Sequence, residues 1–501
     1  MSKSIMIQGT GSGVGKSIIV TALCRIFMQD GYRVAPFKSQ NMALNSGVTI
    51  DGLEMGRAQI TQAEAAGINP IVDMNPILLK PTTDTGAQII VCGKPIGNMQ
   101  AVEYHKYKPQ LTKIIQECFL RLQRQYEIIV IEGAGSPAEI NLKDNDIVNM
   151  YMARVANAPV ILIVAIDRGG AFAWIAGTME LLPEDERTQV KGIIINKFRG
   201  DKTLLLSGLK FLEDRYDVPI LGVIPYFHDI CIEEEDSLGL EKRKKRERGL
   251  RKEIEVVVVQ LPHISNFTDF DMLSREIDVS LKYVKPGEPL GNPDMIILPG
   301  TKSTIADMNY LYTTGCAREI LSIVSGAGST VLLGICGGFQ MLGTSIIDTE
   351  HAESAVEKTN GLGLLDITTT FLPQKLTTQI KAQVYYELFE TGGLEITGYE
   401  IHMGQTTYGN GIAPLFNIIS PENRYDGAVC KDGLIMGTYI HGLFDNHGFR
   451  RVFINYLRKR KGLPSHTTTK QISKEAEYDN LAALIRENVD MERIYSMLLH
   501  K

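Results

Sequence analysis

Two series of apolar runs, separated by a charged stretch, organise the hydrophobic pattern of this chain. The first series alternates with helical stretches, and its runs lie at 4–9, 127–133, 158–167, 190–197 and 219–225. The runs of the second series lie at 253–262, 294–300, 329–336 and 433–442. Short apolar runs that alternate with helices predict a parallel sheet covered by helices. We therefore expect two α/β domains in one chain.

The charged stretch sets the expected domain boundaries. Acidic residues at 233–236 precede a basic run at 242–252, and this mixture is typical of a solvated linker rather than of a binding patch. We predict a first domain at 1–235, a linker at 236–252, a second domain at 253–447 and a helical extension at 448–501. An apolar stripe in that extension indicates packing and consists of Leu481, Leu484, Ile485, Met491, Ile494, Tyr495 and Leu498.

Composition narrows the class of protein. With 501 residues, of which 44% are hydrophobic, the chain is long enough for several cores. A net charge of -6 argues against a nucleic-acid partner, because phosphate binding needs a clustered positive field. The seven cysteines are single, without a CxxC pair, which indicates neither disulfides nor zinc. The apolar runs are too short to cross a membrane. We expect a cytoplasmic protein, and the oligomeric state stays open.

The segment GTGSGVGKS at 9–17 follows the first apolar run and precedes an apolar helix. Glycines such as Gly13 and Gly15 let backbone N–H groups turn onto phosphate oxygens. Lys16 would neutralise the terminal phosphates of ATP, and the Ser17 hydroxyl would hold Mg²⁺. The spacing follows GTxxxVGK[ST], the variant of dethiobiotin synthetase and its relatives. The alternative is a glycine turn with an accidental lysine.

Three polar residues follow strands of the first series. Glu132 ends the run at 127–133, where a carboxylate reaches a metal from the edge of a parallel sheet. A buried or capping glutamate is the alternative, and Asp167 has the same placement and the same ambiguity. Asn196 lies at the end of the run at 190–197, in a position suited to the adenine edge, although a polar turn would look the same.

Cys336 lies in GICGG at 334–338, between an apolar strand and an apolar helix. A sharp strand-to-helix turn of this kind exposes a nucleophile, whereas a lone buried cysteine is the structural alternative. Such a nucleophile opens a carbonyl group. Together with a loop for ATP, it suggests ATP-driven amide formation with nitrogen taken from glutamine.

The cysteine needs a base and an oxyanion site. We expect His441 as the base because it lies at the end of the apolar run at 433–442, and His402 is the rival. Backbone N–H groups of the loop that begins at Gly300, together with the N–H of Gly337, would hold the oxyanion.

Ten ordered segments along nearly the whole chain resemble the cobyric acid synthase family, the glutamine-dependent amidotransferases of cobalamin biosynthesis. The segments are KSQNMALNS, GRAQITQAEAAG, MNPILLKP, IEGAGSPAEINL, AIDRGGAFA, NKFRGD, LPGTKST, GICGGFQMLG, GYEIHMG and GTYIHGLFDN. The resemblance implies a dethiobiotin-synthetase-like P-loop domain joined to a class I glutamine amidotransferase domain. It also implies adenosylcobyrinic acid a,c-diamide as the corrinoid substrate, amidated at its b, d, e and g side chains with ATP, Mg²⁺ and glutamine.

Candidate contacts to the substrate lie in the first three of those segments. They are Lys38, Gln40, Asn41, Arg57 and Lys80. Each of these residue types by itself is usually a solvated surface residue.

One departure from the wider class concerns the triad. Most class I glutaminases carry HxE, but the residue two positions after His441 is Leu443. We therefore expect a Cys-His pair whose imidazole is oriented by another group, which the sequence does not identify.

Two alternative functions stay open at this stage. A cobyrinic acid a,c-diamide synthase would share both domains, although KSQNM, GRAQ and MNPILLKP favour the cobyric acid branch. A regulatory ATPase with a degenerate glutaminase domain is the second, but Gly11 stands where partner-switching ATPases carry a lysine.

Overall fold

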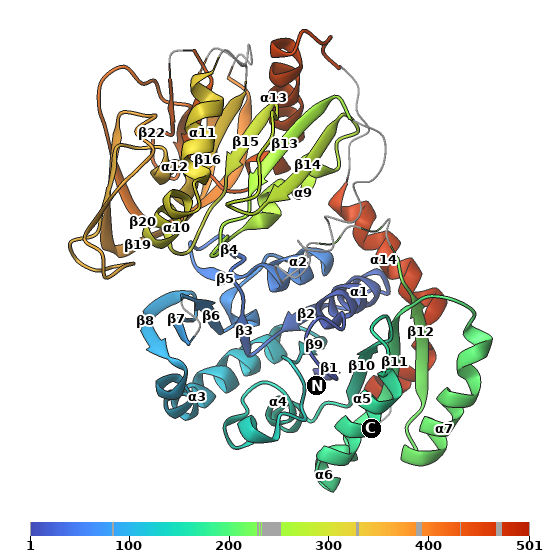
Figure 1. Cartoon of the computed structure of the whole chain (residues 1–501). Coiled ribbons are helices and arrows are strands. Elements are labelled where there is room, and N and C mark those ends of the chain that lie inside the picture. Colours follow the sequence, from blue (N-terminus) through green and yellow to red (C-terminus); the bar gives the residue numbers. More distant parts are fainter. Residues whose placement is uncertain are drawn as a thin grey trace. The chain divides into compact units, whose positions relative to one another are not determined.

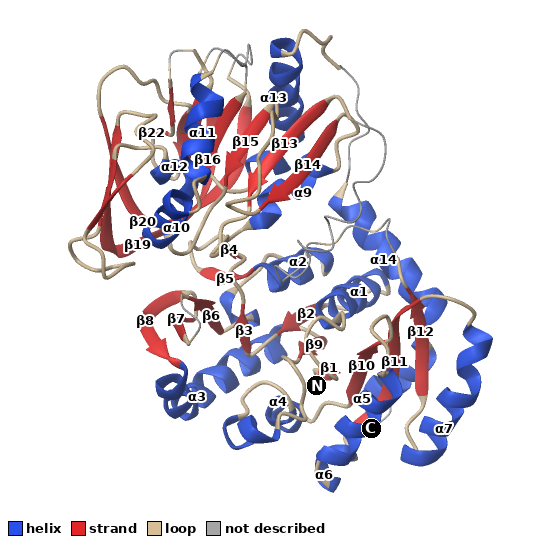
Figure 2. Cartoon of the chain, in the orientation of Figure 1, coloured by secondary structure: helices blue, strands red, loops and turns tan. Residues whose placement is uncertain are grey.

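The computed structural model is shown in Figure 1, and Figure 2 distinguishes its helices from its strands. It describes residues 2–82, 85–227, 230, 232, 252–326, 330–386, 393–430, 432–466 and 473–499. Nearly all of the predicted linker at 236–252 lies outside these residues.

The chain divides into two compact units, which we call unit 1 and unit 2. Unit 1 comprises Met1–Ala43, Glu54–Glu235 and Ser473–Lys501, and unit 2 comprises Leu44–Leu53 and Asp236–Ile472. Two differences from the predicted boundaries follow. Residues 44–53 join unit 2 although they fall inside the predicted first domain, and the predicted extension at 448–501 is split between the two units.

Unit 1 is built on a six-stranded parallel sheet with the order β12-β11-β10-β1-β9-β2. Its strands are β1 (Lys3–Gly9), β2 (Val34–Phe37), β9 (Ile128–Glu132), β10 (Val160–Ala165), β11 (Val190–Phe198) and β12 (Ile220–Pro225). All five apolar runs of the first series are strands of this sheet, which confirms the predicted fold class, and β2 adds an edge strand. The runs are continuously apolar because both faces are covered: Ile5 and Ile7 enter one core and Met6 enters the other.

The helices of unit 1 lie on both faces of this sheet (Figure 1). They are α1 (Lys16–Gln29), α2 (Arg57–Ala65), α3 (Ala101–Gln125), α4 (Met150–Val155), α5 (Ala171–Leu181), α6 (Glu184–Arg187), α7 (Leu206–Tyr216), α14 (Lys474–Asn488) and α15 (Met491–Leu499). Short 3-10 helices occur at η1 (Val72–Met74), η2 (Ile140–Asn145) and η3 (Lys202–Leu205). A second sheet, mostly antiparallel, has the order β3-β6-β7-β8. Its strands are β3 (Gln40–Met42), β6 (Ile77–Pro81), β7 (Gly86–Val91) and β8 (Lys94–Gln100), and β5 (Glu54–Gly56) precedes α2.

Unit 2 holds a sheet with the order β14-β13-β15-β16-β24-β23, parallel except for β23. Its strands are β13 (Ile254–Val259), β14 (Val279–Val284), β15 (Met295–Leu298), β16 (Val331–Ile335), β23 (Ala428–Val429) and β24 (Ile435–Thr438). The four apolar runs of the second series are β13, β15, β16 and β24, as predicted. Helices of this unit are α9 (Asp271–Ser274), α10 (Thr304–Thr313), α11 (Cys316–Ser325), α12 (Gly337–Met341) and α13 (His447–Arg460), with 3-10 turns η4 (Phe267–Phe270) and η6 (Leu443–Asp445).

A second sheet of unit 2 has the order β18-β17-β19-β21-β22, with β20 paired to β19. Its strands are β17 (Ser345–Ile347), β18 (Lys358–Asn360), β19 (Ile367–Val384), β20 (Glu395–Tyr408), β21 (Phe416–Ser420) and β22 (Arg424–Asp426). The long antiparallel pair β19 and β20 was not predicted from the sequence. The segment 44–53 contributes β4 (Ser46–Val48) to this unit.

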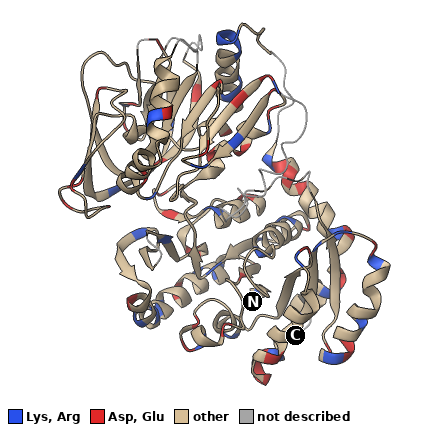
Figure 3. Ribbon diagram, in the orientation of Figure 1, with Lys and Arg blue, Asp and Glu red and all other residues tan. Residues whose placement is uncertain are grey.

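The C-terminal helices explain why the predicted extension is not one part. Phe449 and Phe453 of α13 are buried in the core of unit 2. Leu481 and Ile485 of α14 are fully buried in the α1 side of the unit 1 core. Acidic residues gather near the beginning of α14 (Figure 3). Arg25 of α1 pairs there with Glu475 at 2.6 Å and, one turn further on, with Asp479 at 2.7 Å. The apolar stripe of the C-terminus is therefore a packing surface of unit 1.

Truncation of this packing surface will destabilise unit 1. Leu481→Ala removes a fully buried side chain and should cost about 2–5 kcal/mol of unfolding free energy. The single tryptophan, Trp174, lies in α5 of unit 1, so its fluorescence during urea unfolding reports on this unit. The exposed Glu487→Ala on the same helix is the control and should leave the urea midpoint unchanged. Equal midpoints for both variants would contradict the packing role.

Candidate functional sites

The glycine loop of unit 1 connects β1 to α1. Gly13 and Gly15 have φ values of 68° and 102°, which favour glycine. Gly15 is also fixed sterically, because a Cβ there would lie 2.3 Å from the Asn196 side-chain nitrogen. Lys16 begins α1, and its Nζ donates hydrogen bonds to the carbonyl oxygens of Gly11 at 2.9 Å and Gly135 at 3.1 Å. The loop thus has the curved backbone that phosphate binding requires.

Glu132, at the end of β9, is the centre of a polar cluster beside this loop and is fully buried. Its Oε1 accepts hydrogen bonds from Ser17 Oγ at 2.8 Å and from Lys38 Nζ at 2.9 Å, and its Oε2 accepts one from Gln62 Nε2 at 2.5 Å. The structure therefore brings the two predicted metal ligands, Ser17 and Glu132, together. A hydroxyl and a carboxylate are oxygen donors of the kind that Mg²⁺ takes, so these residues fit the ion. Asp167 is exposed.

Asn196, the predicted contact for ATP, lies against the glycine loop. Its buried Nδ2 donates to the Val14 carbonyl oxygen at 2.9 Å, and the neighbouring Lys197 Nζ donates to the Gly13 carbonyl oxygen. Both side chains brace the glycine loop here. Contact of Asn196 with ATP stays a prediction.

The candidate substrate residues fall into three environments. Lys38 lies on Glu132, whereas Lys80 is buried in an ion pair with Glu54 at 2.8 Å. Gln40 Oε1 accepts a hydrogen bond from Tyr104 at 2.6 Å, and Asn41 Nδ2 donates one to Gln59 at 2.9 Å. Arg57 is the first residue of α2 and is half-buried.

Sequence reasoning missed Gln62, although it lies in GRAQITQAEAAG, one of the segments that carries the family resemblance.

In unit 2, Cys336 follows β16 and precedes α12 with φ 51° and ψ -108°. A non-glycine residue in this region is strained, as in nucleophile elbows. The flanking glycines allow the turn: a Cβ at Gly338 would lie 1.9 Å from the Leu298 carbonyl oxygen, and one at Gly334 would lie 2.6 Å from the Gly338 carbonyl oxygen. The elbow geometry predicted from GICGG is present.

His441, just after β24, is buried and forms a hydrogen-bonded pair with Asp269: its Nδ1 lies 2.6 Å from Asp269 Oδ2. Asp269 Oδ1 also accepts a hydrogen bond from the Gly442 N–H at 3.0 Å. Burial alone would lower the pKa of His441, but the Asp269 carboxylate and then the Cys336 side chain raise it to about 10. The three side chains form a Cys-His-Asp arrangement.

Asp269 is thus the orienting group that the sequence did not identify. It lies in η4, which follows the end of β13, and 172 residues separate it from His441. The available signal was positional, since a carboxylate close behind a parallel strand lies near the edge where the elbow opens.

His402, the rival base, has other partners. Its Nδ1 is 2.8 Å from the Gly404 carbonyl oxygen, and its ring stacks on Tyr439 with centroids 3.8 Å apart. Its Nε2 lies 3.9 Å from Glu400 Oε1. These contacts favour His441 as the base.

The predicted oxyanion loop lies beside the triad. A Cβ at Gly300 would lie 3.0 Å from His441 Cε1, and one at Gly337 would lie 2.6 Å from the Thr301 methyl group. Within the loop, the N–H of Lys302 donates to His263 O and that of Ser303 to Thr301 Oγ1. The oxyanion role of Gly300 and Gly337 stays a prediction, whereas these two N–H groups serve the loop itself.

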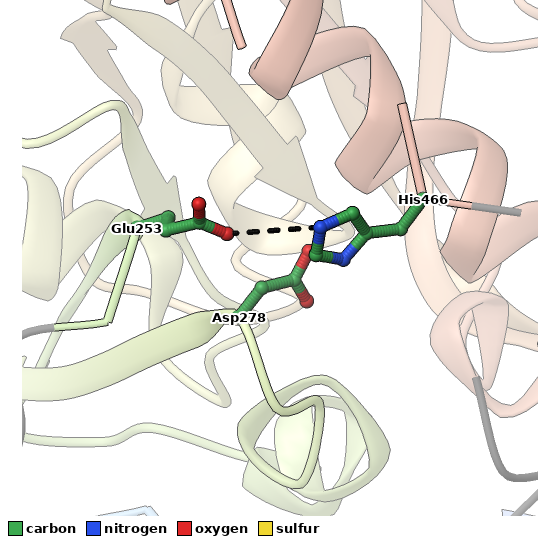
Figure 4. Close-up of side chains that lie close together, drawn as sticks. All are labelled: Glu253, Asp278 and His466. Atoms are coloured by element: carbon green, nitrogen blue, oxygen red, sulfur yellow. Dashed lines mark ion pairs between the residues drawn. The ribbon is translucent and has the colours of Figure 1, made fainter. Parts of the chain in front are cut away.

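Another cluster of potential metal ligands consists of Glu253, Asp278 and His466 (Figure 4). His466 Nδ1 lies 3.5 Å from Asp278 and its Nε2 lies 3.9 Å from Glu253. Arg458 pairs with both carboxylates, and Arg451 pairs with Asp278 at 2.8 Å. Burial would raise the pKa of Asp278, but Arg451 and Arg458 together with a backbone hydrogen bond lower it. The arginines already neutralise these acids, so the cluster is an ion-pair network.

Removal of the Asp269 charge will shift the pH dependence of the triad. Asp269→Asn takes away the carboxylate that raises the pKa of His441, so the imidazolium should lose its proton at lower pH. The alkaline limb of kcat for glutamine hydrolysis, the activity that the resemblance implies, should move down by more than about one pH unit. At neutral pH, kcat should fall by about 10²–10⁴-fold.

The control for this variant is Asp366→Asn, which removes an exposed carboxylate of unit 2. Its pH profile should match that of the unaltered protein. An unchanged alkaline limb in Asp269→Asn would show that Asp269 does not set the protonation of His441.

Each unit matches a protein family. Residues 5–239 match the CobQ/CobB/MinD/ParA nucleotide binding domain, and residues 255–449 match the CobB/CobQ-like glutamine amidotransferase domain. In the part of the chain that the structure describes, no helix combines the length and hydrophobicity needed to cross a membrane.

Relatives cover nearly the whole chain. It is 52% identical to the cobyric acid synthase of Pelotomaculum thermopropionicum over 99% of this chain and 97% of that protein. It is 51% identical to that of Alkaliphilus metalliredigens, over 98% and 99%, and 52% identical to that of Caldanaerobacter subterraneus, over 99% of each. Two adjoining domain matches and full-length identity of this order lead to one conclusion: the chain belongs to the cobyric acid synthase family.

Proposed function

We propose that the protein amidates the b, d, e and g carboxylates of adenosylcobyrinic acid a,c-diamide, using ATP and glutamine, to form adenosylcobyric acid. The observation that carries this proposal is identity of about half the residues over the full chain with proteins named cobyric acid synthase. Both sites described above supply the chemistry that such an amidation needs.

Glutamine is hydrolysed at Cys336. The sulfur attacks the side-chain amide, and as the carbon–nitrogen bond breaks, His441 gives its proton to the departing ammonia. Water then cleaves the thioester to glutamate, with the imidazole accepting a proton from that water. Asp269 holds the imidazole by its Nδ1, so that Nε2 is the atom that exchanges protons.

The corrinoid carboxylate is activated in unit 1. A carboxylate is a poor acylating agent, so transfer of a phosphoryl group from ATP converts it to an acyl phosphate, which ammonia attacks. Lys16 and the backbone of the glycine loop hold the phosphates. Ser17 and Glu132 would hold Mg²⁺, which offsets negative charge on the phosphates when bound. Lys38, on the same carboxylate, adds a second positive charge next to the reacting groups.

A cobyrinic acid a,c-diamide synthase is the alternative within the same chemistry. The relatives at about 50% identity are named cobyric acid synthase, in agreement with KSQNM, GRAQ and MNPILLKP.

Cysteines of the described residues are free thiols, which fits a reducing compartment. We place the protein in the cytoplasm, without a membrane or nucleic-acid partner.

Loss of the nucleophile Cys336 will distinguish amidation driven by glutamine from amidation driven by ammonium. Cys336→Ala should abolish amidation driven by glutamine but retain amidation driven by ammonium, because only the first needs the thioester. Corrinoid mass spectrometry with the a,c-diamide, ATP and Mg²⁺ should show four successive replacements of OH by NH2. Cys430→Ala, a half-buried cysteine of the same unit, is the control. Turnover of undiamidated cobyrinic acid instead would transfer the protein to the alternative activity.

Loss of Lys16 will impair amidation but spare glutamine hydrolysis. Lys16→Ala should lower amidation from both nitrogen sources by about 10²–10³-fold, since phosphoryl transfer precedes the use of either. Basal glutamine hydrolysis should persist, measured as glutamate release. The exposed Lys191→Ala on β11 is the matched control. Amidation by Lys16→Ala at the unaltered rate would exclude the loop as the ATP site.

A further inference from the structure

Residues 44–53 belong to unit 2, although the residues on both sides of them in sequence belong to unit 1. Asn45 and Ser46 are each 1% exposed, so the beginning of the segment is embedded rather than laid over the surface. Val48 of β4 forms a small apolar cluster with Tyr399 and Ile401 of β20.

Three hydrogen bonds hold the beginning of this segment, and a fourth joins two of its partners, Asn266 and Tyr399. Asn45 Oδ1 accepts from the Phe267 N–H at 3.2 Å, and Asn266 Oδ1 accepts from the Ser46 N–H at 3.1 Å. The Tyr399 hydroxyl donates to the Ser46 carbonyl oxygen at 3.2 Å and lies 3.3 Å from Asn266 Nδ2, which donates to it. All four bonds are buried, where hydrogen bonds are strong and their loss is costly.

This network contacts both members of the Asp269–His441 pair. Asn266 precedes η4 with φ 51°, and its carbonyl oxygen accepts a hydrogen bond from the Asp269 N–H at 3.0 Å. The Tyr399 ring stacks on the His441 imidazole, with centroids 5.3 Å apart and planes at 19°. Backbone hydrogen bonds also join Tyr399 and His441 in both directions. A shift of the segment would therefore displace the contacts that Asn266 makes with Asp269 and that Tyr399 makes with His441.

The segment is also tied closely in sequence to the candidate substrate residues. Asn41 precedes Asn45 by four positions, and Arg57 follows Leu53 by four positions. Asn41 is fixed in unit 1 by its hydrogen bond to Gln59. Residues 44–53, which contact the neighbours of the Asp269–His441 pair, are thus continuous in sequence with the candidate substrate residues on both sides.

We propose that residues 44–53 are a coupling segment, through which occupancy of the amidation site sets the position of the Asp269–His441 pair and hence the rate of glutamine hydrolysis. The residues that transmit the effect are Asn45, Asn266 and Tyr399, which act as positioning residues because they act through Asp269 and His441. Catalytic groups must be held to within about 0.5 Å, so a small displacement of this backbone is sufficient to change the rate. The proposal rests on the function proposed above.

The test compares glutamine hydrolysis with and without ATP, Mg²⁺ and the a,c-diamide. Tyr399→Phe removes the hydroxyl and keeps the ring that stacks on His441, and Asn45→Ala removes the acceptor for Phe267 N–H. The matched controls are Tyr310→Phe, a tyrosine 42% exposed in α10, and Ile50→Ala, 71% exposed within the coupling segment. Ammonium-driven amidation is measured on every variant.

The unaltered protein should hydrolyse glutamine about five-fold or more faster when the amidation substrates are bound, the lower end of usual coupling between sites. Tyr399→Phe and Asn45→Ala should lose most of this stimulation through kcat, with the KM for glutamine and ammonium-driven amidation unchanged. The controls should keep it. Absence of stimulation in the unaltered protein, or full stimulation in both variants, would overturn the coupling segment. A parallel loss of ammonium-driven amidation would also overturn it by indicating general damage. Failure of the unaltered protein to amidate the a,c-diamide from either glutamine or ammonium would instead refute the proposed function.

Discussion

The carboxyl edge of a parallel sheet is the constraint on which both sites depend. In unit 1 this edge carries the glycine loop after β1 and Glu132 at the end of β9. In unit 2 it carries Cys336 after β16 and His441 after β24, with Asp269 in the turn that follows β13. Strands that run in one direction end together, so side chains far apart in sequence converge where the backbone turns into helices. Each site is therefore a consequence of strand order.

Within each edge, one buried carboxylate organises its neighbours. Glu132 is fully buried and holds Ser17, Lys38 and Gln62. Asp269 is 4% exposed and holds His441. A buried carboxylate is costly without a partner, and removal of one partner from a buried pair commonly costs about 3–5 kcal/mol. The same pairing that makes burial tolerable fixes the geometry of the reactive groups.

The chain path connects the two units more closely than a simple linker does. After leaving unit 2 at α13, the chain returns to unit 1, where α14 and α15 cover the α1 side of the core. Near the other end, residues 44–53 leave unit 1 to join the unit that holds the triad. The chain therefore passes between the two units after residue 235 and also after residues 43, 53 and 472. The coupling of ammonia release to carboxylate activation proposed above relies on this continuity of the chain.

The sequence by itself determined the strands of both parallel sheets, the glycine loop and the cysteine elbow. These features are local: continuous apolar runs report burial on both faces, and glycine spacing reports a turn that other residues cannot make. It also singled out His441 from its position just after a recognisable strand, and the role of His441 as the base stays a prediction. Only the tertiary structure identified Asp269 as the partner of His441 and Gln62 as a partner of Glu132. It also showed that Asn196 braces the glycine loop, and it assigned residues 44–53 and the C-terminal helices to their units. Those outcomes depend on hydrogen bonds and packing between residues that lie tens to hundreds of positions apart in the sequence. Asp269 and His441, for example, are 172 positions apart, and no local pattern encodes such a pairing.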